Sequence, residues 1–203
     1  MSNQDLIVTD NGQCHAFDID DDAQLPANPY RLYRFLTDIE DILQTISNDY
    51  KRLQLICPLV RRLLNSSYWL QGVYKQPHPK LGWSVEFLYQ EPDFPLTVQN
   101  VAWLPGQASP IHNHGAWGIV ALLSGQETNR LWRRTAEPDW PDRIELVGDR
   151  QLFPGDIIGF TPDAIHNVEA IGDEPTISFN IYGKTNYDQR FEFDPTNNTA
   201  KKF

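Results

Sequence analysis

The sequence predicts a single, mostly β domain with helices on its N-terminal side and with its strands closed into a barrel or a double-sheet jelly roll. Apolar residues recur at helical spacing in residues 27–67, whereas from residue 68 short runs rich in Val, Ile, Phe, Tyr and Trp are separated by Pro, Gly, Asp and Asn. Helices followed by many strands are typical of such α+β arrangements. A chain of 203 residues, 40% of them hydrophobic, can bury one sizeable core.

Residues 1–26 are polar and acidic, so we expect them to pack loosely, and we assign them no chemistry. The first helix is expected next, with Asn28 as its N-cap and Pro29 at its first helical position. Its apolar residues recur at three- and four-residue steps: Leu32, Phe35, Leu36, Ile39, Ile42, Leu43 and Ile46. This spacing predicts one amphipathic helix.

A second helical stretch carries Tyr50, Leu53 and Ile56 at the same spacing. Because a proline inside a helix removes one backbone hydrogen bond, we expect this stretch to stop and restart at Pro58. Further apolar residues follow, and the polar residues 65–67 end the stretch. The helices of residues 27–67 are expected to pack on the barrel.

Residues 68–203 are expected to form the barrel and a C-terminal extension. Short apolar and aromatic runs between turn residues predict strands near residues 69–74, 83–90, 96–104, 110–114, 117–124, 126–134, 144–153, 156–160, 166–170 and 176–183. No repeat of solenoid length is visible among them.

The composition favours a small-molecule or peptide ligand. A net charge of -10, with no cluster of Lys and Arg, argues against nucleic acid and anionic membranes as partners. No apolar run approaches the roughly 20 residues that cross a bilayer, and the first residues lack the pattern of a signal peptide, so we expect a cytoplasmic protein. Cys14 and Cys57 are expected to be free thiols. Monomer and homo-oligomer both remain open.

Three histidines lie in two spaced motifs. His112 and His114 alternate on an expected strand, so both side chains point to the same face. Farther on, a Pro154-Gly155-Asp156 turn leads through an apolar strand to His166. Three neutral imidazoles suit Fe, Zn, Cu, Ni or Mn and leave coordination positions open. The alternative for the paired histidines alone is a surface or hydrogen-bonded core position, and the second motif weakens it.

The ordered motifs make the sequence resemble the cupin superfamily and, within it, cysteine dioxygenase and other thiol dioxygenases. The resemblance spans about residues 68–195 and implies a double-stranded β-helix, the cupin jelly roll. The Trp117-Gly118 pair is most similar to the bacterial branch that includes 3-mercaptopropionate dioxygenase. The motifs are Trp103-Leu104-Pro105-Gly106, Ser109-Pro110-Ile111-His112-Asn113-His114, His114-Gly115-Ala116-Trp117-Gly118, Pro162-Asp163-Ala164-Ile165-His166 and Ser178-Phe179-Asn180-Ile181-Tyr182-Gly183.

By this resemblance, His112, His114 and His166 would hold Fe(II), and O2 would be the co-substrate that turns a small thiol into its sulfinate. Tyr182 would point its hydroxyl group at the bound oxygen or substrate; its alternative is a core position. Ser178 and Asn180 would orient Tyr182. Many members carry histidine where Asn180 stands, and because asparagine does not titrate near neutral pH, we expect Asn180 to position rather than to relay a proton.

The usual cupin glutamate is replaced by Gly118, so no carboxylate completes the metal shell there, and the cysteine-tyrosine crosslink of the animal enzymes cannot form. Glu127 and Asp163 are the carboxylates nearest in sequence. We expect Asp163 to shape the turn before His166 and Glu127 to follow the strand turn at Gly125, neither of them as a ligand. A shell of neutral ligands favours an anionic thiolate.

Three residues are candidates for binding the substrate. Glu86 falls where the family places an arginine that binds the carboxylate of cysteine; it either faces the metal and favours an amine or lies on the solvent face. Arg190 either binds a substrate carboxylate, as an arginine does in the mercaptopropionate branch, or pairs with Glu192 or Asp188 at the surface. Trp117 is the third, and with Trp132 and Phe160 it either lines an apolar pocket or belongs to the core.

The leading hypothesis is an iron-dependent thiol dioxygenase. Two alternatives stay open, a cupin dioxygenase that acts on a carbon substrate and a noncatalytic cupin that binds a small ligand. Three histidines serve the first two equally well, so oxygen uptake with a panel of thiols would separate the thiol dioxygenase from the others. Metal content would separate both enzymes from an empty binding protein.

Overall fold

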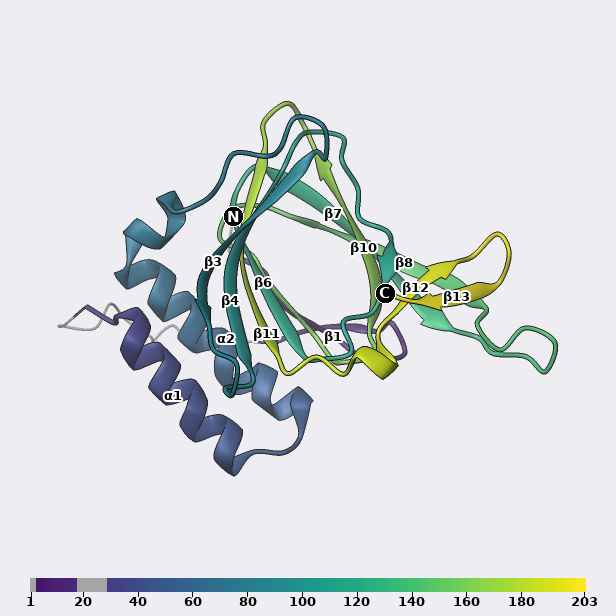
Figure 1. Cartoon of the computed structure of the whole chain (residues 1–203), viewed down its shortest axis with the longest axis horizontal. Coiled ribbons are helices and arrows are strands. Elements are labelled where there is room, and N and C mark those ends of the chain that lie inside the picture. The colour runs from purple at the N-terminus through teal and green to yellow at the C-terminus, as the bar shows by residue number, and fades with distance from the viewer. Residues whose placement is uncertain (1–2, 18–28) are drawn as a thin grey trace.

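The computed structural model describes residues 3–17 and 29–203 (Figure 1). The expected N-cap, Asn28, lies outside the described residues. Helix α1, Leu32–Thr45, begins at a later residue than predicted, after Arg31 in an extended conformation. Pro29 therefore precedes the helix instead of opening it.

Helix α2, Asp49–Ser66, is continuous, so the predicted interruption at Pro58 is wrong. Its first turn is capped by the side chain of Asn48, which accepts a hydrogen bond from the backbone of Lys51. On both sides of the proline the helix is held by side chains without solvent exposure, including Ile56 and Val60. Packing of this face offsets the one backbone bond that proline removes.

The predicted strand at 69–74 is also wrong, because Tyr68–Gly72 forms a 3-10 helix, η1. The side-chain amide of Asn100 donates hydrogen bonds to the backbone carbonyls of Leu70 and Val73, at 2.7 Å in both cases. Leu70 is fully buried. These tertiary contacts favour a turn where the local sequence favours a strand.

The N-terminal segment is ordered over its described part, contrary to the expectation of loose packing. Strands β1, Asp5–Val8, and β2, Cys14–Ala16, form a hairpin. Strand β1 pairs in parallel with β9, Ile157–Phe160, and an ion pair joins Asp5 to Arg61 of α2. The short apolar run of residues 6–8 is buried and extends the barrel core.

Every strand predicted from residue 83 onward is present. The remaining strands are β3 Trp83–Gln90, β4 Leu96–Trp103, β5 Ile111–His112, β6 Gly118–Ser124, β7 Gln126–Arg134, β8 Ile144–Leu152, β10 Ile165–Ile171, β11 Thr176–Gly183, β12 Phe191–Asp194 and β13 Thr199–Lys202. One sheet has the order β2-β1-β9-β6-β11-β4-β3, and the other has the order β13-β12-β5-β10-β7-β8. The C-terminal hairpin of β12 and β13 was not predicted.

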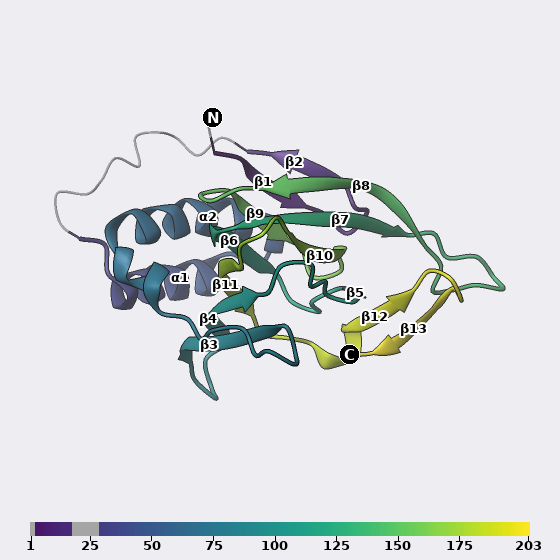
Figure 2. The same ribbon diagram turned by 90° about the horizontal axis from the view of Figure 1, so that it is seen from above.

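The two sheets surround a central space, and α1 and α2 cover the outer face of the first sheet (Figures 1 and 2). Buried side chains from both sheets pack together in one core cluster, among them Val8, Val120, Leu131 and Leu152. The predicted fold class, a mostly β jelly-roll barrel with N-terminal helices, is confirmed. None of the helices in the described part of the chain is both long and apolar enough to span a membrane.

Candidate metal centre

The three predicted histidines meet inside the barrel. His112 ends β5, His114 follows it, and His166 lies directly opposite His112 in the antiparallel pair of β5 and β10. One ring nitrogen from each side chain lies within 4.8 Å of the other two. The three side chains are at most 9% exposed. The strand pairing, and not proximity in the sequence, brings His166 to the other two.

Hydrogen bonds on the far side of two rings fix which nitrogen faces the centre. The Nδ1 atom of His112 lies 2.9 Å from the backbone carbonyl of Pro110, so Nδ1 carries the proton. The Nδ1 atom of His166 lies 3.0 Å from the side-chain oxygen of Asn129 and is protonated for the same reason. Both Nε2 atoms therefore present a lone pair, and that of His166 is 3.1 Å from Nε2 of His114.

Burial lowers the pKa of all three histidines, and their mutual repulsion adds to the effect for His114 and His166. The rings are therefore neutral, the form that binds metal ions. The buried lone pairs of His112 and His166 need a donor or a cation, and Nδ1 of His114 is buried without a hydrogen-bond partner among the described residues. The donor set thus fits a divalent transition metal with three imidazole ligands.

Behind His166 lies a short polar series. The side-chain amide of Asn129 donates a hydrogen bond of 3.1 Å to the carboxyl group of Glu127, which leaves its oxygen to accept from His166. Both side chains come from β7 and are almost fully buried. Such partners hold a ligand ring in its tautomer and orientation. The sequence signal for them was two polar residues at alternate positions of a strand, and its importance was missed.

Glu127 and Asp163 lie outside the group of three metal-ligating nitrogens. Burial raises the pKa of Glu127 to about 7. Asp163 is in the turn before β10, where its carboxyl group accepts a hydrogen bond from Asn113. Its predicted place in the turn is thus the observed one.

Tyr182, Asn180 and Ser178 form the series expected on β11. The hydroxyl group of Tyr182 donates to the side-chain oxygen of Asn180 at 3.2 Å, and the amide of Asn180 donates to the hydroxyl oxygen of Ser178 at 2.9 Å. The ring centre of Tyr182 is 5.0 Å from that of His114. Burial raises the pKa of Tyr182, so its hydroxyl group stays protonated. Because the hydroxyl proton of Tyr182 is donated to Asn180, the lone pairs of the hydroxyl oxygen remain free to accept a hydrogen bond.

Gly118 leaves room for the ring of Tyr182 because it has no side chain. A Cβ atom at Gly118 would lie 2.8 Å from Cδ1 of Tyr182 and 3.1 Å from Nδ1 of His114. Contacts this short require the ring to move. A glutamate at this position is therefore incompatible with the observed position of Tyr182.

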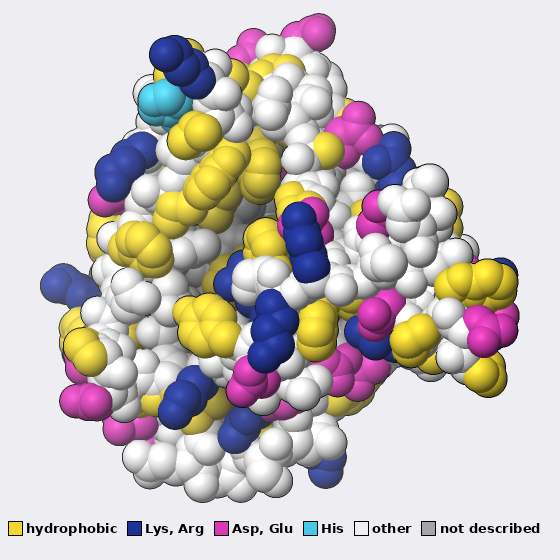
Figure 3. Space-filling model, turned by 45° about the vertical axis from the view of Figure 1, so that its right-hand side comes forward, with side chains coloured by type: hydrophobic (Ala, Val, Ile, Leu, Met, Phe, Trp, Pro, Cys, Tyr) yellow, Lys and Arg dark blue, Asp and Glu magenta, His cyan; other side chains and the backbone are white. Residues whose placement is uncertain are grey.

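A cavity of about 570 Å³ opens above the histidines, and it is visible as the hollow in Figure 3. Its deep end holds the three histidines with Tyr182, Asn180 and Glu127. Toward the opening, one wall is apolar and is formed by Leu81, Trp83, Val85, Val101 and Trp103, and Gln107 and Ser109 also line the cavity.

Arg190 lines this cavity instead of pairing with surface acids. Its guanidinium carbon is 4.4 Å from the ring centre of Phe203, and its Nε atom is buried and makes no hydrogen bond among the described residues. Asp188 and Glu192, its expected alternative partners, pair with Lys202 and Lys201. Arg190 thus lines the cavity without an ion pair among the described residues.

Glu86 and Trp117 lie outside the cavity, which corrects their assignment to substrate binding. Val85 lines the cavity, so strand alternation turns Glu86 to the other face of β3, where it pairs with Lys75 at 3.2 Å. Trp117 is buried in the core beneath the helices.

The other two aromatic candidates are also not among the cavity-lining residues. Trp132 donates a hydrogen bond to Asn167. Phe160 packs against the ring of His166, with 4.1 Å between ring centres. These positions agree with the alternative that assigned the two side chains to the core.

No protein-family model matches the sequence. Similar solved structures include oxalate oxidase in complex with the substrate analogue glycolate, at 13% sequence identity and a TM-score of 0.42 over 57% of each chain. A cupin superfamily protein from Desulfitobacterium hafniense DCB-2 matches at 10% identity and a TM-score of 0.42, over 57% of this chain and 86% of that one. The Cnp3 cupin domain of Schizosaccharomyces pombe matches at 11% identity and a TM-score of 0.43, over 57% of this chain and 66% of that one.

These neighbours include cupin-superfamily proteins, and the aligned part spans little more than half of the oxalate oxidase chain. Their identities and TM-scores are low. The fold class of this chain therefore stands on its own strand order and helices, and its possible metal site stands on the three histidines.

Proposed function

We propose that this chain is a cupin-type, iron-dependent thiol dioxygenase that uses O2 to convert a thiol into its sulfinate. The observation that carries the proposal is the joint placement of three neutral imidazoles and a tyrosine hydroxyl around one cavity, with no carboxylate in the metal-binding group found among the described residues. Neutral ligands leave the charge of a divalent ion uncompensated, so the site favours an anionic sulfur ligand. Fe(II), when bound, would supply the redox chemistry with dioxygen.

Tyr182 and Arg190 have separate roles in this proposal. The hydroxyl oxygen of Tyr182, held by Asn180, accepts a hydrogen bond at the reacting end of the substrate or positions it by contact. Arg190 supplies parallel N–H donors for a carboxylate, and its contact with Phe203 restricts its side chain. Since Glu86 faces away, the cavity favours a thiol with a carboxylate, such as 3-mercaptopropionate, over cysteamine.

The second candidate function is oxygenation of a carbon substrate in the same cavity. Glu127 favours it, because a buried carboxyl group with a pKa of about 7 is suited to accept a proton from a carbon acid. Asn129 already occupies one of its oxygens, and the tyrosine series faces the same space. The thiol hypothesis uses more of the described groups, so it is the leading one.

The test is anaerobic loading with Fe(II), addition of oxygen, and mass spectrometry of each candidate substrate. The panel contains 3-mercaptopropionate, cysteine and cysteamine, with a β-diketone and a flavonol as carbon substrates. A sulfinate that contains two oxygen atoms from labelled O2 supports the proposal, whereas cleavage of a carbon substrate supports the second candidate. Oxidation that persists in His166→Ala would exclude the proposed centre.

A further inference from the structure

The cavity is much larger than a small thiol requires. Its volume is about 570 Å³. Cavities of roughly 300–1,000 Å³ hold ligands the size of drugs. A thiol with a three-carbon body, such as 3-mercaptopropionate, would occupy the space near the histidines and leave the outer part to water.

The outer part has an apolar wall, although Gln107 and Ser109 also line it. Trp83 and Trp103 lie side by side on β3 and β4, with 6.0 Å between ring centres, and Val85 and Val101 continue the same wall toward the metal centre. Trp83 is 42% exposed at the mouth. Aromatic rings that face water at the entrance of a cavity gain stability when an apolar ligand covers them.

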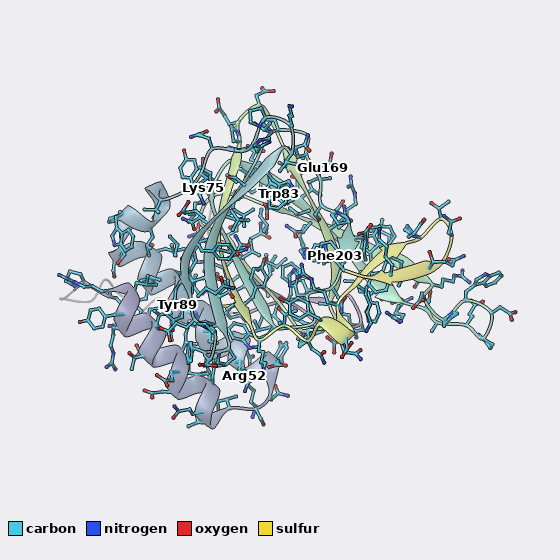
Figure 4. The ribbon with its side chains drawn as sticks, viewed as in Figure 1. Arg52, Lys75, Trp83, Tyr89, Glu169 and Phe203 are labelled. Atoms are coloured by element: carbon cyan, nitrogen blue, oxygen red, sulfur yellow. The ribbon has the colours of Figure 1, made fainter. Side chains whose placement is uncertain are left out.

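Phe203 contributes a further aromatic ring to this space. It lines the cavity, and its ring centre is 5.6 Å from that of His112. Figure 4 shows Trp83 and Phe203 at the rim of the central space, one from β3 and the other beyond β13. An apolar group that reaches out from the histidines therefore has aromatic rings from both sheets beside it.

The wall of Trp83, Val85, Val101 and Trp103 carries no charged side chain. Among the described residues that line the cavity, Arg190 and Glu127 are the charged or ionisable ones besides the histidines and Tyr182. Glu127 is fully buried beside Asn129, and Arg190 contacts Phe203. The site thus combines ionisable groups near the histidines with an apolar wall on β3 and β4, and such a combination can orient an amphipathic ligand.

We propose that the substrate carries an apolar body, an aromatic ring or a branched hydrocarbon group, that lies against Trp83 and Trp103 while its reacting group lies at the histidines. The thiol as reacting group rests on the proposed function, whereas the apolar contact does not. Cysteine and 3-mercaptopropionate are then poor substrates that fill only the deep end of the cavity.

The test compares two thiol carboxylates that differ in their bodies, 3-mercaptopropionate and 2-benzyl-3-mercaptopropionate, with the iron-loaded protein. We expect kcat/KM to be at least about tenfold higher for the benzyl thiol, since a few well-packed methylenes discriminate by this much. Trp83→Ala should reduce this ratio by about tenfold, and Trp83→Phe should restore most of it. Trp69 is 57% exposed on η1 and outside the cavity, so Trp69→Ala is the matched control and should leave the ratio unchanged.

Anaerobic binding of thiol-free analogues separates this inference from the proposed reaction. Titration of the iron-loaded protein with 3-phenylpropionate and propionate, by calorimetry, should show tighter binding of the phenyl compound, weakened in Trp83→Ala. If this binding is found while every thiol stays unoxidised, the apolar site stands and the thiol chemistry fails. Equal kcat/KM values for the two thiols, equal binding of the two acids and no effect of Trp83→Ala would overturn the inference, even where 3-mercaptopropionate is oxidised.

Discussion

Replacing Glu127 by Gln should stabilise the metal-free protein at alkaline pH and leave its stability in acid almost unchanged. The side chain is 2% exposed, and no ion pair of the described residues includes it. Burial raises its pKa from 4.5 to about 7, although the hydrogen bond from Asn129 opposes this shift. The folded protein therefore keeps a proton that the unfolded chain releases.

The direction and the size of the stability change follow from the difference in pKa between the folded and the unfolded state. Below pH 4.5 both states are protonated, and the folded state has no disadvantage from this group. As the pH rises to about 7, the unfolded chain ionises first, so the free energy of unfolding falls. The two pKa values correspond to roughly 3 kcal/mol at about 1.4 kcal/mol per unit. Glutamine has no proton to release, so the variant escapes this loss.

Urea unfolding in the presence of a chelator, at about pH 4 and about pH 8, measures the effect by linear extrapolation. The stability difference between Glu127→Gln and wild type should grow by roughly 3 kcal/mol from the acid to the alkaline condition. Glu174 is exposed, so Glu174→Gln is the control for loss of a surface carboxyl group. If the stability difference between Glu127→Gln and the wild type does not change with pH, the claim that the buried Glu127 carboxyl group has a raised pKa is refuted.

Three further substitutions test the deep end of the cavity. Tyr182→Phe should keep iron and folding but lower the sulfinate formed per oxygen consumed, because the hydroxyl that positions the reacting groups is lost; unchanged coupling, read by oxygen electrode and mass spectrometry, would make Tyr182 a packing residue. Arg190→Ala should raise the KM of carboxylate thiols about thirtyfold or more, which corresponds to a loss of roughly 2 kcal/mol in apparent binding. A KM equal to that of the wild type in steady-state assays would exclude Arg190 as the group that binds the carboxylate. Gly118→Ala should lower the melting temperature and the iron content, because the new Cβ moves Tyr182 and His114 and costs about 1–3 kcal/mol of folding stability. The control is Gly148→Ala, where a Cβ meets nothing within 4 Å, and it should change neither quantity.

The barrel and the group of three histidines were predictable from strand spacing together with the order of the motifs. Alternation predicted that His112 and His114 share one face, and the turn before His166 marks the strand that pairs with β5 at His112. The N-terminal hairpin was missed because its apolar run at residues 6–8 is short and stands in an acidic, polar segment. The η1 turn depends on hydrogen bonds from Asn100, about thirty residues away, and no local pattern reveals them.

The substrate-facing residues were harder to predict because they depend on which face of a strand points inward. Residues 83–90 have apolar or aromatic side chains at every odd position, so alternation places Glu86 on the opposite face, but it does not say which face of the strand points into the barrel. The place of Arg190 depends on the C-terminal hairpin, which brings Phe203 against it and gives its acidic neighbours to lysines. These are tertiary contacts between segments that local spacing does not connect.

The iron content of the purified protein tests the central claim most directly. After anaerobic loading with Fe(II) and gel filtration, elemental analysis of the wild type should give close to one iron per chain, and His112→Ala, His114→Ala and His166→Ala should each lose most of it, since all three ligands meet at one point. His15 is exposed on β2 and away from the centre, so His15→Ala should retain the full content. A wild type that takes up no iron, or three histidine variants that keep it, would contradict the account.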